Sequence, residues 1–440
     1  MLNEKVSKKQ HLKPQMDLES NGSDDLENVW KNLFNLTDIV FWLDYLCSKT
    51  KTHSVVLDYK KGNFLVSIYT ESMNMSSEAK THNSLLLREL IREDNFGSVT
   101  TILLECHLVE IVLPLFPNYA ISHFIGYLAY QSFGTCKYLI ENDFVDMLIR
   151  CLYDENEELC YFIECAGYIG NYRDFENEME SMIDLLSHFV INDYDFYIKT
   201  KAIKSISKII FNSKKLCSKL VSNNQNFQKI LILCGETNKF VSDAVLEMIG
   251  AVLNNKIIKD ENILFTILRI FDIKLKTSDE CTMIYVVEAI ERGLSFKYNL
   301  VDKTDFPKLC ITSGIFNLLI ELFSKNIFSF ELHSKLFSSI CLIFIDVDTE
   351  QKINFIKSGF LNFFIDNCFE MIEIKENIIS KFLLDLFNLF IQIKDENLHA
   401  FFLNEETQNI IELLLLTEDC EVRLIAKTLD EKINELAMNN

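Results

Sequence analysis

Two copies of one short pattern, 41 residues apart, constrain the fold more than any other feature of this chain. The first reads Gly-Tyr-Leu-Ala-Tyr at residues 126–130, and the second reads Gly-Tyr-Ile-Gly-Asn at residues 167–171. The final position recurs as Asn212 and Asn254, 41 and then 42 residues further on. Repetition near 40 residues is typical of solenoids, in which each unit buries its apolar face only against its neighbours.

A second apolar pattern, out of phase with the first, indicates several helices in each repeat. Two apolar residues, a polar residue and two or three apolar residues follow one another at 144–149, 315–320, 360–365 and 410–415, for example. The 440 residues include only four prolines and 12 glycines, which are the residues least tolerated inside helices. We therefore predict an all-α chain.

The last helix of each repeat, called the third helix below, carries the register of the first pattern. In residues 201–212 the lysines Lys201, Lys204 and Lys208 are spaced at i, i+3 and i+7 beside a stripe of isoleucines, which predicts one wet and one buried face. The predicted third helices are 85–92, 121–130, 159–170, 201–212, 241–254, 283–296, 332–345 and 380–393.

No linker is visible after residue 84, so the sequence predicts one continuous stack of helices rather than separate domains. The expected divisions are a disordered tail (1–28) and a solenoid (29–440), the latter made of a cap (29–84), repeats (85–417) and a C-terminal capping helix (418–436). The closing helix has one apolar stripe and a charged outer face, as the end of a stack requires.

The N-terminal cap is the part least determined by its pattern. We expect a first helix over 29–46, with Trp30 and Trp42 sealing the open end of the stack. Residues 55–69 fit either a β-hairpin or helices, and the helical surroundings favour helices. A polar loop is expected over 70–84.

The charge is strongly negative and uneven. A net charge of −21 argues against nonspecific binding to nucleic acid and favours basic partners. Residues 141–199 hold 15 acidic and three basic residues, a net charge of −12. The candidate acidic surface consists of Asp154, Glu155, Glu157, Glu158 and Glu164. Ordinary solvated helix faces are the alternative interpretation.

No pattern of catalytic or metal-binding residues is found. The 13 cysteines are spread singly, with no Cys-x-x-Cys pair, and no phosphate loop or catalytic motif is present, so we expect no enzyme activity, metal or cofactor. The odd cysteine number and the start without a signal-peptide pattern predict a reducing compartment. Lys381 and Asp385 interrupt the most apolar long run, 378–393, so no membrane insertion is expected.

From residue 85 to about 435 the pattern resembles armadillo repeats. Asn142-Asp143-Phe144, Ser313-Gly314-Ile315 and Ser358-Gly359-Phe360 are similar to that family's join between a short first helix and an apolar second helix. The segments that end in Asn171, Asn212 and Asn254 are similar to the end of its third helix. The resemblance implies an armadillo/HEAT-type, right-handed α-solenoid superhelix of about eight repeats, with third helices lining a concave groove.

Within that family the asparagines are similar to the array of the importin alpha group. There, Trp-x-x-x-Asn repeats hold an extended peptide, with asparagine amides on its backbone and tryptophans forming slots for lysine stems. A carboxamide suits this task because it offers two donors and an acceptor. The resemblance implies a peptide-binding groove at Tyr130, Asn171, Asn212, Asn254 and Phe296.

The tryptophan positions depart from that group. The residue four before each register position is Gly126, Gly167, Lys208, Gly250 or Arg292, so no aromatic slot remains. Glycines that allow close helix packing, and asparagines that only cap helices, are the alternative interpretations.

We therefore expect a non-enzymatic protein-interaction scaffold. Its sharpest form is a divergent nuclear-import adaptor that binds basic localisation segments of cargo and docks on an import receptor. The alternative is a structural or regulatory platform subunit of a cytosolic complex, which binds folded partners through its acidic face. The expected location is the cytoplasm, with the nucleus added in the adaptor role.

Overall fold

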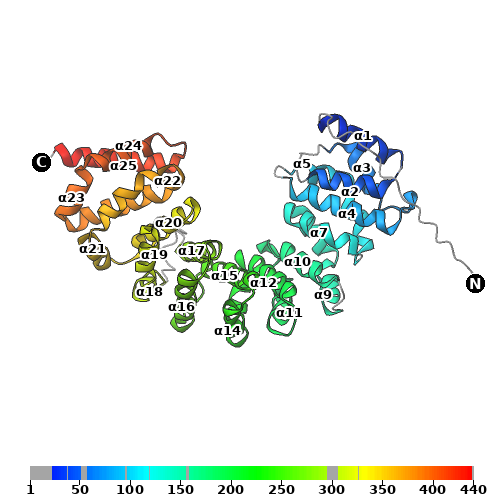
Figure 1. Cartoon of the computed structure of the whole chain (residues 1–440), viewed down its shortest axis with the longest axis horizontal. Helices are drawn as coiled ribbons and strands as arrows, with labels where there is room; N and C mark the ends of the chain where they lie inside the picture. Colours follow the sequence, from blue (N-terminus) through cyan, green and yellow to red (C-terminus); the bar gives the residue numbers. More distant parts are fainter. Residues whose placement is uncertain are drawn as a thin grey trace, which may run out of the picture. The chain divides into compact units, whose positions relative to one another are not determined.

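The computed structural model describes residues 22–36, 38–50, 57–94, 97–117, 119–154, 158–294, 306–325 and 327–438. These residues form α-helices numbered α1 to α25 and four short 3-10 helices, and no strand occurs among them (Figure 1). The prediction of an all-α, repeat-like helical fold is therefore confirmed. The chain divides into two compact units, Met1–Leu148 and Ile149–Asn440.

Unit 1 is built from short helices that pack pairwise around α4. Its helices are α1 (Gly22–Phe34), α2 (Ile39–Thr50), α3 (Tyr59–Ser67), α4 (Ser77–Arg92), α5 (Ser98–Glu105), α6 (Leu108–Val112), α7 (Tyr119–Gln131), α8 (Phe133–Glu141) and the start of α9 (Phe144–Tyr153), with 3-10 turns at Glu71–Met73 and Leu113–Leu115. The main packed pairs are α2 with α4 and α4 with α7.

The N-terminal predictions need three corrections. Residues 22–28, assigned to a disordered tail, lie in α1, while residues 1–21 lie outside the described part. The single helix predicted over 29–46 is wrong, because positive φ angles at Leu36 and Asp38 separate α1 from α2. The loop predicted over 70–84 ends early, since Ser76 caps α4 by accepting a hydrogen bond from the amide of Ala79.

Residues 57–69 contain the helix α3, so the helical interpretation of this stretch is confirmed over the β-hairpin. Asp58 accepts a hydrogen bond from the amide of Lys61 and starts α3 at Tyr59. Both tryptophans of the cap are buried, which agrees with a role in sealing apolar surface. Residues 55 and 56, the first two of the stretch for which a hairpin was considered, lie outside the described part.

Unit 2 repeats one arrangement of helices. Its helices are α10 (Leu159–Ile169), α11 (Glu180–Ile191), α12 (Phe196–Phe211), α13 (Lys214–Ser222), α14 (Asn224–Ile232), α15 (Lys239–Asn254), α16 (Glu261–Thr277), α17 (Glu280–Leu294), α18 (Phe306–Thr312), α19 (Ile315–Ser324), α20 (Phe330–Asp346), α21 (Thr349–Lys357), α22 (Phe360–Ile393), α23 (Glu396–Leu403), α24 (Glu405–Leu415) and α25 (Cys420–Met438), with 3-10 turns at Arg173–Phe175 and Leu233–Gly235.

The third helices of unit 2 pack against one another in chain order, α10 with α12, α12 with α15, α15 with α17, α17 with α20 and α20 with α22. We call this row the third-helix layer. In Figure 1, α11, α14 and α16 form a second layer along α12, α15 and α17. Each predicted third helix of this unit lies within an observed one, apart from the C-terminal residues of 159–170, 201–212 and 283–296.

The last predicted third helix, 380–393, does not begin at a loop. It continues from the preceding second helix as one segment, α22, which bends at Lys375 (φ −122°, ψ 24°). Apolar side chains on both sides of the bend hold it against α20, since the ring of Phe364 lies 6.0 Å from that of Phe337 and the ring of Phe382 lies 5.0 Å from that of Phe344, measured between centroids. The second and third helices are therefore joined by a bend that is stabilised by packing, and not by a turn that a glycine or proline would indicate in the sequence.

The cysteines and the apolar runs serve mainly the core. Nine of the 13 cysteines are buried, all 13 are free, and burial raises the pKa of the Cys136 thiol to about 12. No single helix in the described ranges is long and apolar enough to cross a bilayer. Two bent helix pairs, 98–115 and 306–324, reach the required length and composition only when their halves are combined.

Candidate functional site

The third-helix layer is parallel and in register, which places equivalent residues of successive repeats side by side. Glu164 in α10 faces Lys201 in α12, and the ends of both helices also meet. Near its own start, α15 meets the start of α17, where Thr282 donates a hydrogen bond to Asp243. Residues at the same position of each helix therefore form rows across the layer.

Gly167 is one of the glycines that occupy the tryptophan position, and the structure shows why it is small. A Cβ atom built on Gly167 would lie 2.8 Å from the Cα atom of Ser205 and 2.6 Å from its hydroxyl oxygen. The Ser205 hydroxyl donates a buried hydrogen bond of 2.8 Å to the carbonyl oxygen of Ile163. Close packing of α10 on α12, which was one of the alternatives, therefore accounts for this glycine.

Gly250 leaves space for the side chain of Arg292 from the next third helix. A Cβ atom there would lie 3.3 Å from Cδ of Arg292 and from Cα of Ala289. The guanidinium of Arg292, on α17, lies 5.4 Å from the ring centroid of Phe211 at the end of α12. The missing side chain on α15 lets this arginine reach across one helix to an aromatic ring two helices away.

Lys208 likewise faces a ring of the preceding repeat. Its ammonium lies 3.7 Å from the ring centroid of Tyr168. Burial lowers the pKa of Lys208, against the opposing effect of Glu164 and Glu247. Two of the positions that hold tryptophan in the resembled group thus hold cations that cover aromatic rings inside the chain.

The predicted groove asparagines join the ends of the third helices. The side-chain amide of Asn212 donates to the carbonyl oxygen of Asn171 (3.1 Å), and the amide of Asn254 donates to the carbonyl oxygen of Phe211 (3.3 Å). Both amides therefore satisfy carbonyl groups that helix ends leave unpaired. The side chain of Asn171 is half-buried and has no hydrogen-bond partner within the described ranges.

A neighbouring asparagine, Asn255, was not predicted from the sequence. Its buried side-chain amide donates to the carbonyl oxygens of Ile210 (2.8 Å) and Ala251 (2.9 Å). It is the residue after the register position, so the 41-residue spacing did not select it. The pair Asn254-Asn255 was the available signal, because two consecutive amides at a helix end can both donate to carbonyl groups at the end of the neighbouring helix, as both do to that of Phe211.

The other two predicted groove residues, Tyr130 and Phe296, do not belong to the described part of this layer. Tyr130 belongs to unit 1, at the end of α7, where its side chain is 43% exposed. Phe296 lies outside the described residues, after the end of α17. The structure therefore joins Asn171, Asn212 and Asn254 and leaves the proposed five-residue groove untested at its two ends.

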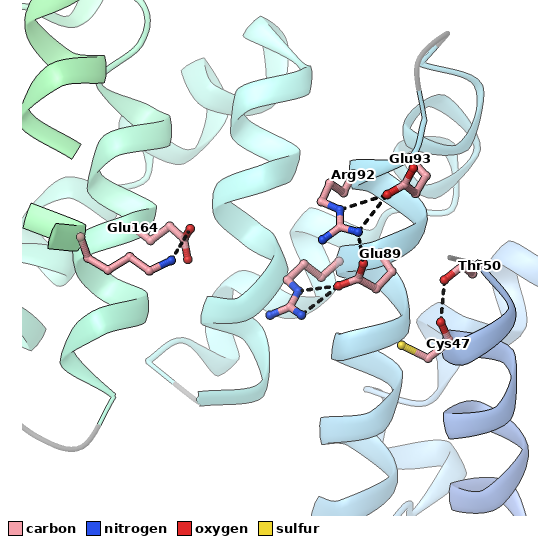
Figure 2. Close-up of polar contacts among 8 residues, drawn as sticks. Cys47, Thr50, Glu89, Arg92, Glu93 and Glu164 are labelled. Atoms are coloured by element: carbon pink, nitrogen blue, oxygen red, sulfur yellow. Dashed lines mark hydrogen bonds and ion pairs between the residues drawn. The ribbon is translucent and has the colours of Figure 1, made fainter. Parts of the chain in front are cut away.

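The predicted acidic surface is only partly open. Asp154 is exposed and Glu158 is half-buried, while Glu155 and Glu157 lie outside the described part of the chain. Glu164 accepts a hydrogen bond of 2.9 Å from the ammonium of Lys201 (Figure 2). Its charge is therefore compensated within the chain.

The lysines that follow the acidic tract pair with acids of the preceding repeat. Lys215 lies 2.9 Å from Glu180, and Lys219 lies 2.8 Å from Asp184. Further along, Lys335 meets Glu288 of the preceding repeat and Lys239 meets Asp279 of the following one, each at 2.8 Å. We call these contacts the inter-repeat ion pairs. They reduce the free negative charge that a basic partner would meet.

One of these pairs predicts a measurable pH dependence. Hydrogen bonds from Lys239 and from the Thr282 amide hold the pKa of Asp279 below its ordinary value of 3.8. Since the folded pKa is the lower one, the contribution of Asp279 is complete above about pH 4 and is lost as pH falls through the folded value. We expect Asp279→Ala to lower the free energy of unfolding by about 1 kcal/mol at pH 7, because the amide of Thr282 loses its hydrogen-bond acceptor at the start of α17.

Thermal unfolding at several pH values checks this. The difference in Tm between Asp279→Ala and the unaltered chain should shrink steadily below pH 4. The same substitution at exposed Asp154, which has no ion-pair partner in the described ranges, serves as the control and should give a small difference at pH 7. A difference for Asp279→Ala that stays constant from pH 7 to pH 2.5 would contradict the ion-pair origin.

Exposed aromatic side chains mark one edge of the third-helix layer. Phe196 and Tyr197 begin α12, Phe240 is the second residue of α15 and Phe330 begins α20. Their exposed fractions are 54%, 48%, 68% and 51%. Because the helices are parallel, these four residues, called the aromatic edge below, belong to the same side of the layer. Exposed aromatics gathered on one side are typical of protein-binding surfaces.

Unit 1 holds the most strongly buried charge of the described chain. The carboxylate of Glu89, in α4, is 2% exposed. The guanidinium of Arg88 donates two hydrogen bonds to one carboxylate oxygen, and Nη2 of Arg92 lies 2.7 Å from the other. Figure 2 shows Arg92 also bonded to Glu93. The arrangement is a compensated structural cluster, since both arginines are already paired.

No family model and no curated protein matches this chain. The solved structures that match include three crystal structures described as engineered proteins. One of them is 13% identical over 93% of this chain and 99% of its own, with a TM-score of 0.57. Two others are 13% and 12% identical over 52% and 54% of this chain, and 95% and 98% of their own, with TM-scores of 0.43 and 0.44. The first likeness shows a shared helical fold alone.

Proposed function

We propose that this chain is a non-enzymatic protein-interaction scaffold made of about eight armadillo-type repeats in a right-handed superhelix. Parallel third helices that pack in sequence, with glycines at their closest approach, support this architecture. Such a stack offers a long surface to partners, while the inter-repeat ion pairs help to hold one repeat to the next.

The observation that carries the proposal is the aromatic edge. Four large aromatic side chains stay about half exposed or more at the starts of α12, α15 and α20. Burying one such side chain against a partner is worth roughly 1.5–3 kcal/mol. The inter-repeat ion pairs, by contrast, compensate acids of α10, α11 and α17, among them Glu164, Asp184 and Glu288. We therefore favour a platform that binds a folded partner through the aromatic edge over one that binds through an acidic face.

Replacing two of these aromatics tests the platform. We expect Tyr197→Ser with Phe240→Ser to weaken the stable complex recovered from cytosol by at least tenfold, because each loses buried apolar contact. Affinity purification with quantitative mass spectrometry measures the partner recovered per mole of chain. Tyr153→Ser with Ile232→Ser, which changes two other exposed residues, is the control. Equal recovery by both variants and the unaltered chain would contradict a role for the aromatic edge.

The second candidate is the nuclear-import adaptor, which shuttles between cytoplasm and nucleus with an import receptor. Two observations favour it. The side-chain amide of Asn171 has no hydrogen-bond partner in the described chain, and Asp243 and Glu247 present half-exposed carboxylates on α15. The exposed lysine Lys204 on α12 opposes it, because it would repel a basic segment along the same face.

A direct binding measurement separates the adaptor from the platform. In the adaptor role, a fluorescein-labelled basic localisation peptide binds, and Asn171→Ala with Asn212→Ala weakens it by about tenfold through loss of backbone hydrogen bonds. Fluorescence anisotropy at 150 mM salt gives the affinities. A matched peptide with alanines in place of its lysines is the control. If the double variant binds as tightly as the unaltered chain, the asparagines do not contact the peptide.

A further inference from the structure

A cleft of about 480 Å³ lies where the end of α21 and the start of α22 meet α23. Its floor is apolar and buried, and is formed by Ile356, Leu361, Ile365 and Phe401. A volume in this range is typical of sites that hold a bound molecule. Neither the packing of the repeats nor the aromatic edge accounts for this cleft.

The rim of the cleft carries polar groups that the protein itself does not use. The exposed side-chain amides of Asn362 and Asn397 have no hydrogen-bond partner in the described part of the chain. The side chain of Asn404 uses only its oxygen, Oδ1, which accepts a hydrogen bond from the backbone amide of Glu406 and caps α24. Three carboxamides around an apolar floor thus offer donors and acceptors of the kind that pair with peptide groups.

The charge at the rim is positive. Lys357 is the one ionised side chain among the residues that line the cleft, and it has no ion-pair partner within the described ranges. No carboxylate lines the cleft. A single cation is too little to hold a nucleic acid, whose binding depends on many phosphate contacts, but it suits one carboxylate placed beside an apolar group.

We propose that this cleft binds a short segment of a partner protein that carries a bulky apolar side chain next to an aspartate or glutamate. The apolar side chain rests on Leu361 and Phe401, and the neighbouring carboxylate pairs with Lys357. The amides of Asn362 and Asn397 hydrogen-bond the backbone of the segment. This site is separate from the aromatic edge, and gives the scaffold a second contact of different chemistry.

Peptide selection on the full chain tests the proposal. Phage-displayed random dodecapeptides are selected on the immobilised protein, and recovered peptides are labelled for fluorescence anisotropy. We expect recovered sequences to place an acid within two residues of Leu, Ile or Phe. Their affinity should fall at least tenfold in Lys357→Glu and severalfold in Asn362→Ala with Asn397→Ala, all exposed positions.

Two controls keep the test specific. Lys427→Glu reverses another exposed lysine, on α25, and should leave binding unchanged. Tyr197→Ser with Phe240→Ser should also leave it unchanged, so that failure of the aromatic edge and failure of the cleft are told apart. Recovery of basic peptides only, of no peptide above background, or of peptides that bind Lys357→Glu as well as the unaltered chain overturns the proposal.

Discussion

Gly167→Ala is expected to lower the free energy of unfolding of unit 2 by about 3 kcal/mol. The new methyl group would lie 2.8 Å from the Cα atom of Ser205, so the backbones of α10 and α12 must separate to admit it. That movement also stretches the buried hydrogen bond from Ser205 to Ile163. Because backbone atoms, unlike a flexible side chain, cannot rotate away, relaxation recovers little of this loss.

Hydrogen exchange of α10 and α12, together with urea unfolding, measures the effect. Gly235→Ala is a matched control, since a Cβ atom there meets nothing within 4 Å. We expect that control to stay within about 0.5 kcal/mol of the unaltered chain. Equal protection of α10 in both variants would show that the helix contact adjusts without cost, which contradicts the packing explanation for Gly167.

The second large effect is expected in unit 1. Arg88→Met with Arg92→Met leaves the carboxylate of Glu89 buried without a cation, which should cost about 3 kcal/mol. The carboxylate is only 2% exposed, so water cannot replace the lost hydrogen bonds without opening α4. The two methionines keep most of the apolar volume of the arginine stems, which isolates the charge from the packing.

Adding Glu89→Met provides the decisive comparison. If the cost comes from an uncompensated charge, the triple variant should recover most of the stability that the double variant loses. Hydrogen exchange in α4 and α7 reports on the unit concerned, and Lys137→Met controls for the loss of an exposed lysine. A triple variant that is no more stable than the double one would instead assign the loss to arginine packing.

The third helices could be predicted from sequence because each combines an apolar stripe with a fixed register. The predictions failed where the determining interaction is not periodic. Two residues with positive φ, Leu36 and Asp38, split the predicted first helix, although neither is glycine. The bend of α22 at Lys375 depends on rings packed from α20, which no local pattern reveals.

The candidate site was also predicted only as far as its residues follow the repeat. The spacing predicted that the asparagines lie in one row, and Asn171, Asn212 and Asn254 do meet at the helix ends. It did not predict that two of their amides pair with the chain. The acidic tract was likewise taken as a surface, because the lysines that neutralise it lie 35 to 37 residues away, as in Glu164 with Lys201 and Asp184 with Lys219.

The inter-repeat ion pairs also restrict how such a chain can change over generations. The direction differs between contacts, since Lys335 pairs with Glu288 of the preceding repeat whereas Lys239 pairs with Asp279 of the following one. A duplicated or transposed module would therefore meet a neighbour that lacks the matching charges. These modules are therefore not interchangeable parts, because each depends on the charges of its own neighbours.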